Sequence, residues 1–118
     1  TYDDLRGVGG GNLKYDLWIP ELGLLIEYDG DQHFNPDNAW YDSLPAGTFE
    51  DRVRADRQKT AYAKVNNIPF IRIPFWHRDE MGEIINRILD DTDFIPIYNA
   101  RVERETNEKY PELKNIQG

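Results

Sequence analysis

The sequence predicts a single α/β domain in which a mixed β-sheet is flanked by helices. Two apolar segments separated by a turn sequence precede position 30, and a run of good helix formers follows position 48. A third apolar segment, bounded by prolines, follows that run. The 118 residues have the length of one compact domain, and a hydrophobic content of 39% is enough for one core.

The first two predicted strands, Lys14–Ile19 and Leu24–Asp29, form an antiparallel hairpin around the turn sequence Pro-Glu-Leu-Gly at positions 20–23. A symmetric turn places Ile19 opposite Leu24 and Asp16 opposite Glu27. Because side chains alternate along a strand, the two faces differ. The core face carries Tyr15, Leu17, Ile19, Leu24, Ile26 and Tyr28, and the other face carries Asp16, Glu27 and Asp29 above Trp18 and Leu25.

A loop is predicted from Phe34 to Gly47, followed by a long helix through Val65. The helix begins with Thr48–Asp51, which resembles a capping box with aspartate in the position of the usual glutamate. Ile68–Phe75 is the third strand, and its prolines favour its ends. A second helix is expected after a cap at Asp79, with apolar residues at helical spacing: Met81, Ile84, Ile85, Ile88 and Leu89.

Three regions are expected along the chain. Residues 1–12 are a flexible, glycine-rich lead-in, residues 13–97 form the domain, and residues 98–118, which are mostly charged and polar, form a peripheral helix or a linker. The chain has no apolar run of membrane-spanning length and no cysteine. We therefore expect a soluble, cytoplasmic protein without disulfides or thiolate metal sites.

The formal net charge of −8 is unusual for a protein that binds nucleic acid, but the charge is unevenly distributed. In the segment 50–78 the cations outnumber the carboxylates, whereas the first half of the chain is acidic. Carboxylates that hold a cation beside cations that hold phosphates suit a divalent-metal phosphodiesterase. An acidic solvated surface with ordinary helix charges is the alternative.

The acidic face of the hairpin is the first candidate site. Asp16, Glu27 and Asp29 would repel one another there, and a bound cation is the simplest compensation. Oxygen ligands without cysteine favour magnesium, manganese or calcium. Alternatively, the register differs by one residue, or Lys14 neutralises the patch.

His33 follows the second strand and could deprotonate a water molecule, because the ordinary pKa of histidine lies near neutrality. A structural or merely exposed histidine is the alternative. Gln32 offers an amide to orient water or phosphate. Asp56 and Lys59, three residues apart on the long helix, suit either a local ion pair or a carboxylate at a metal site next to a phosphate-binding lysine.

Four segments in this order resemble a known family: 15–20 (YDLWIP), 26–34 (IEYDGDQHF), 56–59 (DRQK) and 68–73 (IPFIRI). They are similar to phage-type homing endonucleases of the EDxHD group, relatives of the very short patch repair endonuclease in the PD-(D/E)xK superfamily. The resemblance covers the chain from about Leu13 to Phe75, and four blocks in the right order are more specific than any single motif.

The resemblance implies a restriction-endonuclease-like sheet and a metal-dependent DNA endonuclease, with residues 13–97 as the nuclease domain. Asp16 would bind Mg²⁺, which Mn²⁺ could replace, and the backbone carbonyl of Tyr28 would be a second ligand. His33 would activate or position the attacking water, and Asp56 would be the last aspartate of the motif. Lys59, Arg57 and Arg72 would contact phosphates of the DNA.

Two positions depart from the family. Glu27 and Asp29 occupy the acidic and lysine positions of the wider superfamily pattern, so His33 or Lys59 would have to replace the usual lysine. The leading glutamate of the group has no counterpart before Glu21, so it lies outside this chain or its role has passed to Glu27.

The resemblance also implies partners and a setting. The substrate would be double-stranded DNA, reached through oligomerisation or through a tethered DNA-binding region beyond residues 98–118. The setting would be the cytoplasm of a bacterial host if the protein is phage-encoded. The alternative function is a catalytically idle nuclease-like module that binds nucleic acid. A glycosidase is a poor third hypothesis, because facing strand residues lie closer than the carboxyl pairs of such enzymes.

Overall fold

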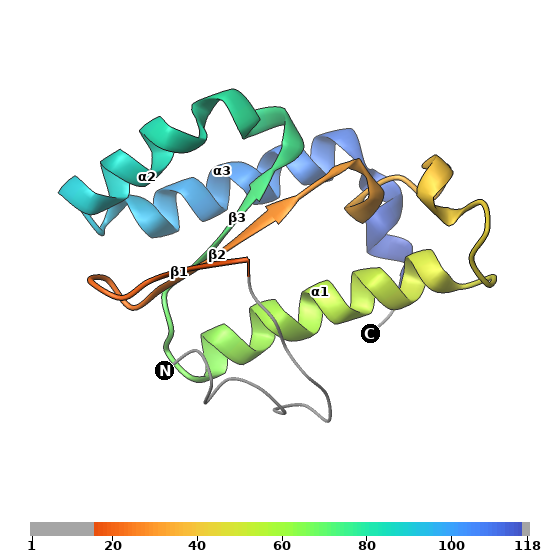
Figure 1. Cartoon of the computed structure of the whole chain (residues 1–118), viewed down its shortest axis with the longest axis horizontal. Helices are drawn as coiled ribbons and strands as arrows, with labels where there is room; N and C mark the ends of the chain where they lie inside the picture. Colours follow the sequence, from red (N-terminus) through yellow and green to blue (C-terminus); the bar gives the residue numbers. More distant parts are fainter. Residues whose placement is uncertain (1–15, 117–118) are drawn as a thin grey trace.

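The computed structural model describes residues 16–116 (Figure 1). The predicted lead-in and the residues Leu13, Lys14 and Tyr15 lie outside this range. The strands are β1 (Leu17–Ile19), β2 (Leu24–Asp29) and β3 (Phe70–Pro74), and the helices are α1 (Thr48–Val65), α2 (Met81–Asp90) and α3 (Phe94–Lys109). Short 3₁₀ turns occupy Asp31–His33, Ala39–Tyr41, Phe75–Glu80 and Pro111–Asn115.

The three strands form one mixed sheet in the order β1-β2-β3. The first two are antiparallel with Leu17 opposite Ile26 and Ile19 opposite Leu24, which confirms the predicted register. The last two are parallel and are joined through α1, so that Glu27 lies opposite Arg72. The α/β class with a mixed sheet is therefore confirmed.

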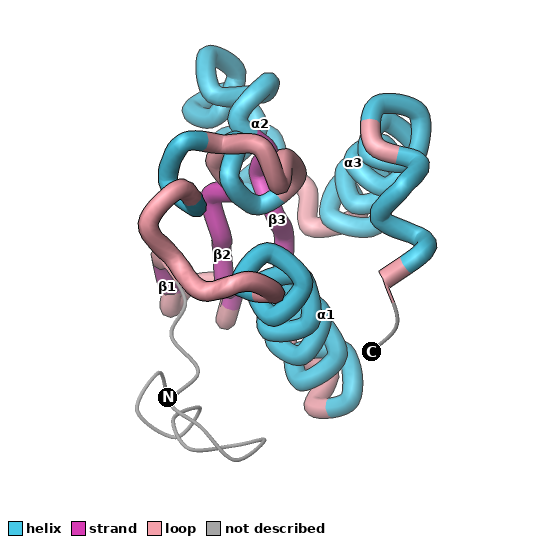
Figure 2. Tube along the Cα trace, turned by 90° about the vertical axis from the view of Figure 1, so that its right-hand side faces the viewer, coloured by secondary structure: helices cyan, strands magenta, loops and turns pink. Residues whose placement is uncertain are grey.

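Helices cover both faces of the sheet, with α1 on one side and α2 with α3 on the other (Figures 1 and 2). The larger core lies under α2 and α3 and comprises Leu24, Ile26, Ile71, Ile73, Ile84, Ile88 and Tyr98. A smaller cluster under α1 comprises Leu25, Ala63 and Phe70.

The expected division into a core face and an open face needs correction. Leu17, expected in the core, is 50% exposed, because the short strand β1 lies at the edge of the sheet. Leu25, expected on the polar face, is 0% exposed, because α1 packs over that face. The acidic residues of β2 on the same face are consequently buried beneath a helix.

Both predicted helix caps are wrong, although the bounds of α1 agree with the prediction. The cap of α1 is Gly47, whose φ of +86° favours glycine, and the Thr48 hydroxyl donates to the Pro45 carbonyl instead of capping the helix. Asp79 lies inside the 3₁₀ turn that leads directly into α2, whose cap position is Glu80.

The segment that follows residue 97 begins inside a helix that packs on the domain. Residue 98 lies within α3, Tyr98 is 0% exposed, and the Asn99 side-chain amide donates to the Phe70 carbonyl of β3. Ile95, Tyr98 and Val102 recur at helical spacing and pack on the core, a short apolar stripe hidden within a polar sequence. None of the helices within residues 16–116 is both long and apolar enough to cross a membrane.

Candidate functional site

Most of the predicted site residues gather where the end of β2 and the turn Asp31–His33 meet α1. A cleft of about 510 Å³ opens there. It is lined by Asp16, Glu27, Tyr28, Gln32, His33, Arg52, Ala55, Asp56 and Lys59. Residues from the hairpin, the turn and the helix thus share one cavity, as the hairpin register and the helix spacing predict.

The carboxylates at the hairpin end of the cleft have different surroundings. Asp16 is exposed, and its Oδ2 accepts a hydrogen bond of 2.8 Å from the backbone N–H of Tyr28. Glu27 is 3% exposed and accepts a bond of 2.7 Å from the Lys59 ammonium. Burial raises the pKa of Glu27 to about 7, Lys59 opposes this change, and the neighbouring carboxylate of Asp16 adds to it.

His33 is held through both ring nitrogens. Its Nδ1 lies 2.7 Å from Oδ2 of Asp56 and 3.5 Å from Oδ1 of Asp29, and its Nε2 lies 3.0 Å from Nη2 of Arg52. Because a guanidinium can only donate, Nε2 is the acceptor and the proton resides on Nδ1. The ring is therefore neutral, with its basic nitrogen on the side of Arg52.

Asp56 is the carboxylate that orients the His33 ring. Burial acts to raise its pKa, but the hydrogen bond from His33 and the charges of Arg72 and Arg52 prevail and hold the pKa below its ordinary value. Asp56 thus stays ionised and fixes the imidazole in one tautomer and orientation. This is the arrangement that keeps a histidine ready to accept a proton at its other nitrogen.

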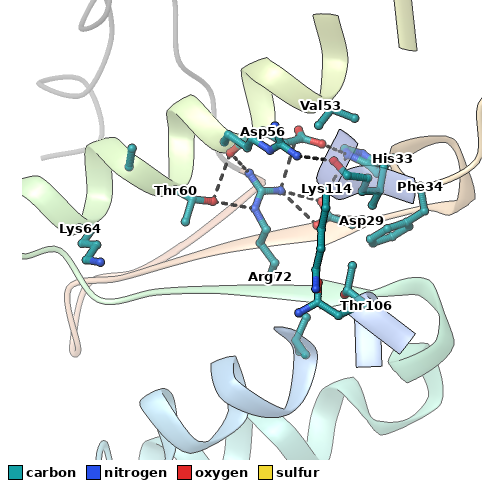
Figure 3. Close-up of a pocket in the computed structure, with 15 residues that line it drawn as sticks. Asp29, His33, Phe34, Val53, Asp56, Thr60, Lys64, Arg72, Thr106 and Lys114 are labelled. Atoms are coloured by element: carbon teal, nitrogen blue, oxygen red, sulfur yellow. Dashed lines mark hydrogen bonds and ion pairs between the residues drawn. The ribbon is translucent and has the colours of Figure 1, made fainter. Parts of the chain in front are cut away.

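Arg72 is engaged within the protein (Figure 3). Its Nη1 donates to both carboxylate oxygens of Asp29 at 2.9 and 3.1 Å, its Nη2 donates to the Asp56 carbonyl at 2.7 Å, and its Nε donates to the Thr60 hydroxyl at 3.0 Å. All three nitrogens of Arg72 have partners, so this arginine ties β2 and β3 to α1. Its predicted phosphate contact would require these bonds to break.

One group among the described residues has the composition of a metal site: ligand atoms of Asp29, His33 and Asp56 lie within 4.8 Å of one another. Arg72 already supplies positive charge to this group, with Nη1 at 2.9 Å from Asp29 and 3.9 Å from Asp56. In the cleft, by contrast, Asp16 is exposed and has no ion pair within residues 16–116, and Glu27 is paired with Lys59. Oxygen ligands for a hard cation are therefore better available at Asp16 and Glu27.

Arg57 does not line the cleft, although its predicted contact with a DNA phosphate would require it to do so. Its guanidinium donates to the backbone carbonyls of Leu113, at 2.7 Å, and Ile116. These bonds hold the turn Pro111–Asn115 against α1. Behind the His33–Asp56 pair, a second cavity of about 500 Å³ lies between α1 and α3, and Arg57 lines that cavity and not the acidic cleft.

Arg52 is a site residue that the sequence analysis does not identify, because several other cations lie on the same predicted helix. Its position four residues before Asp56 and seven before Lys59 places all three on one face of α1, and this spacing was the available signal. The guanidinium carbon also lies 5.2 Å from the ring centroid of Trp40, a side chain that is 50% exposed.

The loop after β2 fixes the turn that carries Gln32 and His33. Asp31 accepts hydrogen bonds from the side-chain amides of Asn35 and Asn38, and the Tyr41 hydroxyl donates to the Gln32 carbonyl. Gly30 has an ordinary φ of −71°, but a Cβ there would lie 2.7 Å from Oε1 of Gln32. The glycine therefore leaves room for the glutamine side chain that lines the cleft.

No protein-family model matches this chain, and neither a curated protein nor a solved structure gives a match. The function must therefore be inferred from the chemistry of the cleft.

Proposed function

We propose that the protein is a divalent-metal-dependent endonuclease that hydrolyses phosphodiester bonds in DNA. The observation that carries this proposal is the pair His33–Asp56, with a neutral imidazole whose Nδ1 is held at 2.7 Å by a carboxylate. Its basic nitrogen lies in a cleft that also contains Asp16, Glu27 and Lys59. A base, hard oxygen ligands and an ammonium are the groups that metal-assisted hydrolysis of a phosphate ester requires.

The donor set of the cleft fits a hard cation. Asp16 and Glu27 offer carboxylate oxygens, and the cleft contains no sulfur ligand, which favours Mg²⁺, with Mn²⁺ as a substitute. Tyr28 also lines the cleft, and its backbone carbonyl is the further ligand that the resemblance proposes. When bound, the cation would polarise the scissile phosphate and stabilise the departing oxygen.

The protein's own residues then have distinct roles. His33 accepts the proton of the attacking water at Nε2, while Asp56 holds Nδ1–H and stabilises the imidazolium that forms. Lys59 offsets negative charge on the phosphate, and the Gln32 amide orients the water or a phosphate oxygen. These roles need no movement of the turn Asp31–His33, which its loop already holds.

The finer identity is part of the proposal. The antiparallel hairpin, the parallel third strand and the intervening helix are compatible with a restriction-endonuclease-like fold, and the four motif blocks support a place in the EDxHD homing group. Double-stranded DNA is the proposed substrate. Because the chain has a net charge of −8, binding would depend on a tethered DNA-binding region or on a second subunit. The proposed setting is the cytoplasm.

One observation favours a second function, an idle nuclease-like module that binds nucleic acid. The ion pairs Lys59–Glu27 and Arg72–Asp29, at 2.7 and 2.9 Å, compensate the buried carboxylates within the protein. A site that is balanced in this way is stable without a metal ion. An idle module would bind DNA with the same affinity in Mg²⁺ and in EDTA and would leave the DNA intact.

Supercoiled plasmid DNA tests the proposal directly. The purified protein and the variants Asp16→Asn and Asp42→Asn are incubated with plasmid in Mg²⁺ and in EDTA; Asp42 is an exposed aspartate outside the cleft and serves as the control. We expect cleavage in Mg²⁺ by the wild type and by Asp42→Asn, and none by Asp16→Asn or in EDTA. Equal cleavage by Asp16→Asn would remove the proposed metal site.

A further inference from the structure

Arg52 differs from the other arginines of the site in how its nitrogens are used. Its Nη2 lies 3.0 Å from Nε2 of His33, and its Nε is the buried side-chain nitrogen that has no hydrogen-bond partner among residues 16–116. No carboxylate within the described range lies at ion-pair distance from it. By contrast, Arg72 and Arg57 are anchored on oxygen atoms of the protein.

The bond between Arg52 and His33 blocks the nitrogen that catalysis would use. A neutral imidazole has one lone pair, on the ring nitrogen that carries no proton, and here that lone pair accepts from Arg52. Arginine remains protonated at all relevant pH values, so the bond cannot be reversed by proton transfer. A water molecule cannot donate to Nε2 while Arg52 occupies it.

We propose that a phosphate of the bound DNA draws Arg52 away from His33, so that Nε2 becomes free only when the substrate is present. This inference rests on the nuclease function proposed above and adds to it a substrate-contacting residue that also gates the base. The phosphate that recruits Arg52 is a phosphodiester of the strand in the cleft, since Arg52 and Lys59 line the same cavity.

Two features of the geometry favour this exchange. A charged phosphate oxygen is a stronger acceptor for a guanidinium than a neutral ring nitrogen, because both partners are ionised. In addition, Nε and one terminal nitrogen form an edge of the guanidinium that matches two phosphate oxygens, so the unpartnered Nε would gain an acceptor.

Trp40 provides the surface along which the exchange can occur. The guanidinium of Arg52 lies 5.2 Å from the centre of the Trp40 ring, and half of the tryptophan surface faces solvent. A planar cation can shift over an aromatic face without losing its attraction to the ring. Arg52 would therefore retain this contact while its donors turn from His33 to a phosphate.

Nuclear magnetic resonance measures the exchange without relying on cleavage. In protein labelled with ¹⁵N, Arg52 guanidinium protons and the His33 ring are close enough for a nuclear Overhauser effect in the free state. A short DNA duplex is then added with Ca²⁺ in place of Mg²⁺, and binding is measured in parallel by fluorescence anisotropy of the labelled duplex. We expect the Overhauser effect to disappear and the Arg52 Nε–H resonance to shift downfield, with no change at Arg54, an exposed arginine of the same helix.

The outcomes separate this inference from the proposed function. If the duplex binds while Arg52 stays on His33, the gate is refuted and the nuclease proposal stands. If the duplex does not bind, Arg52 has no phosphate to leave His33 for and the gate is refuted, while plasmid cleavage in Mg²⁺ decides the nuclease proposal separately.

Steady-state cleavage by Arg52→Gln gives a second readout, with Arg54→Gln as the matched control. Loss of a phosphate contact predicts a KM about tenfold higher or more, whereas kcat falls less because Nε2 is no longer capped. If Arg52 only positioned the imidazole, Arg52→Gln would lower kcat and leave KM unchanged, and that result would overturn the gate. Arg54→Gln should match the wild type in both constants.

Discussion

Nδ1 of His33 and Oδ2 of Asp56 lie 2.7 Å apart, although the residues are 23 positions apart in the chain. Two independent features create this proximity. The loop after β2 fixes the turn Asp31–His33 through hydrogen bonds, and α1 packs over the end of the same strand. The pair therefore depends on the fold of the whole α1 side of the sheet.

Replacing Asp56 by asparagine should abolish most of the proposed activity. An amide can donate to Nδ1, which would move the ring proton to Nε2 and remove the basic nitrogen from the cleft. We expect plasmid cleavage to slow by about 10²-fold to 10⁴-fold, with a circular dichroism spectrum like that of the wild type. The exposed Asp51→Asn on the same helix is the control. Wild-type cleavage by Asp56→Asn would contradict the role given to this pair.

Glu27 should give the protein an unusual pH dependence. Its pKa in the folded protein is about 7, above the ordinary 4.5, because burial disfavours the charged form. The folded state thus holds the proton more tightly than the unfolded state, so the stabilising contribution is complete below pH 4.5 and is lost as the pH rises through about 7. The loss amounts to as much as about 3 kcal/mol.

Urea unfolding in EDTA, compared between wild type and Glu27→Gln at several pH values, measures this contribution. The difference in unfolding free energy should change in favour of Glu27→Gln as the pH rises, since the variant has no charge to bury. The exposed Glu108→Gln should follow the wild type throughout. A difference that does not vary with pH would show that Glu27 has the same pKa in the folded and the unfolded protein, and would contradict this account.

A second buried network should show the opposite pH dependence. Glu105 accepts hydrogen bonds from Trp76 at 2.7 Å and Arg101 at 3.0 Å and lies 2.6 Å from Nε2 of the buried His77. Although burial acts to raise its pKa, these partners lower it to about 2. The stabilisation is therefore present above the ordinary value of 4.5 and is lost as the pH falls through about 2.

Glu105→Gln should lower the free energy of unfolding at neutral pH by about 1–3 kcal/mol, because buried donors lose a charged acceptor. Chemical denaturation of this variant and of the exposed Glu103→Gln tests the expectation. Equal stability of the two variants would mean that the network contributes nothing. Plasmid cleavage serves as a specificity check, since Glu105 lies outside the acidic cleft.

The packing of α1 on the sheet is tested by two leucines of the hairpin. Leu25→Ala should destabilise the protein by about 2–5 kcal/mol, because its side chain is fully buried between β2 and α1. Leu17→Ala should cost less than about 1 kcal/mol, since half of its surface is exposed. Thermal or urea unfolding measures the loss of stability in both variants. A larger loss for Leu17→Ala than for Leu25→Ala would contradict the packing of α1 over Leu25 and would favour the core face that the sequence suggests.

Much of the frame could be predicted from local patterns. The turn Pro20–Gly23 and the alternation around it gave the hairpin register, and helix formers between Thr48 and Val65 gave the bounds of α1. Together they also brought Asp16, Glu27 and His33 to one cleft with the carboxylate of α1. These features depend on neighbouring residues, which is why a sequence reveals them.

The remaining features depend on how distant elements pack. The burial of Leu25 and the position of Tyr98 follow from helices that cover both faces of the sheet, and no local alternation shows this. Likewise, Arg57 and Arg72 looked like free cations but are bound by segments far away in the chain. The contact of Arg52 depends on packing in the same way, because its partner, the His33 ring, comes from another element.

The most direct test of the proposed function is the cleavage of long duplex DNA by the purified protein in Mg²⁺ and in EDTA, compared with His33→Ala. We predict cleavage by the wild type in Mg²⁺ alone, and none by His33→Ala although it folds. Cleavage by His33→Ala at the wild-type rate would contradict the role of His33 as the base.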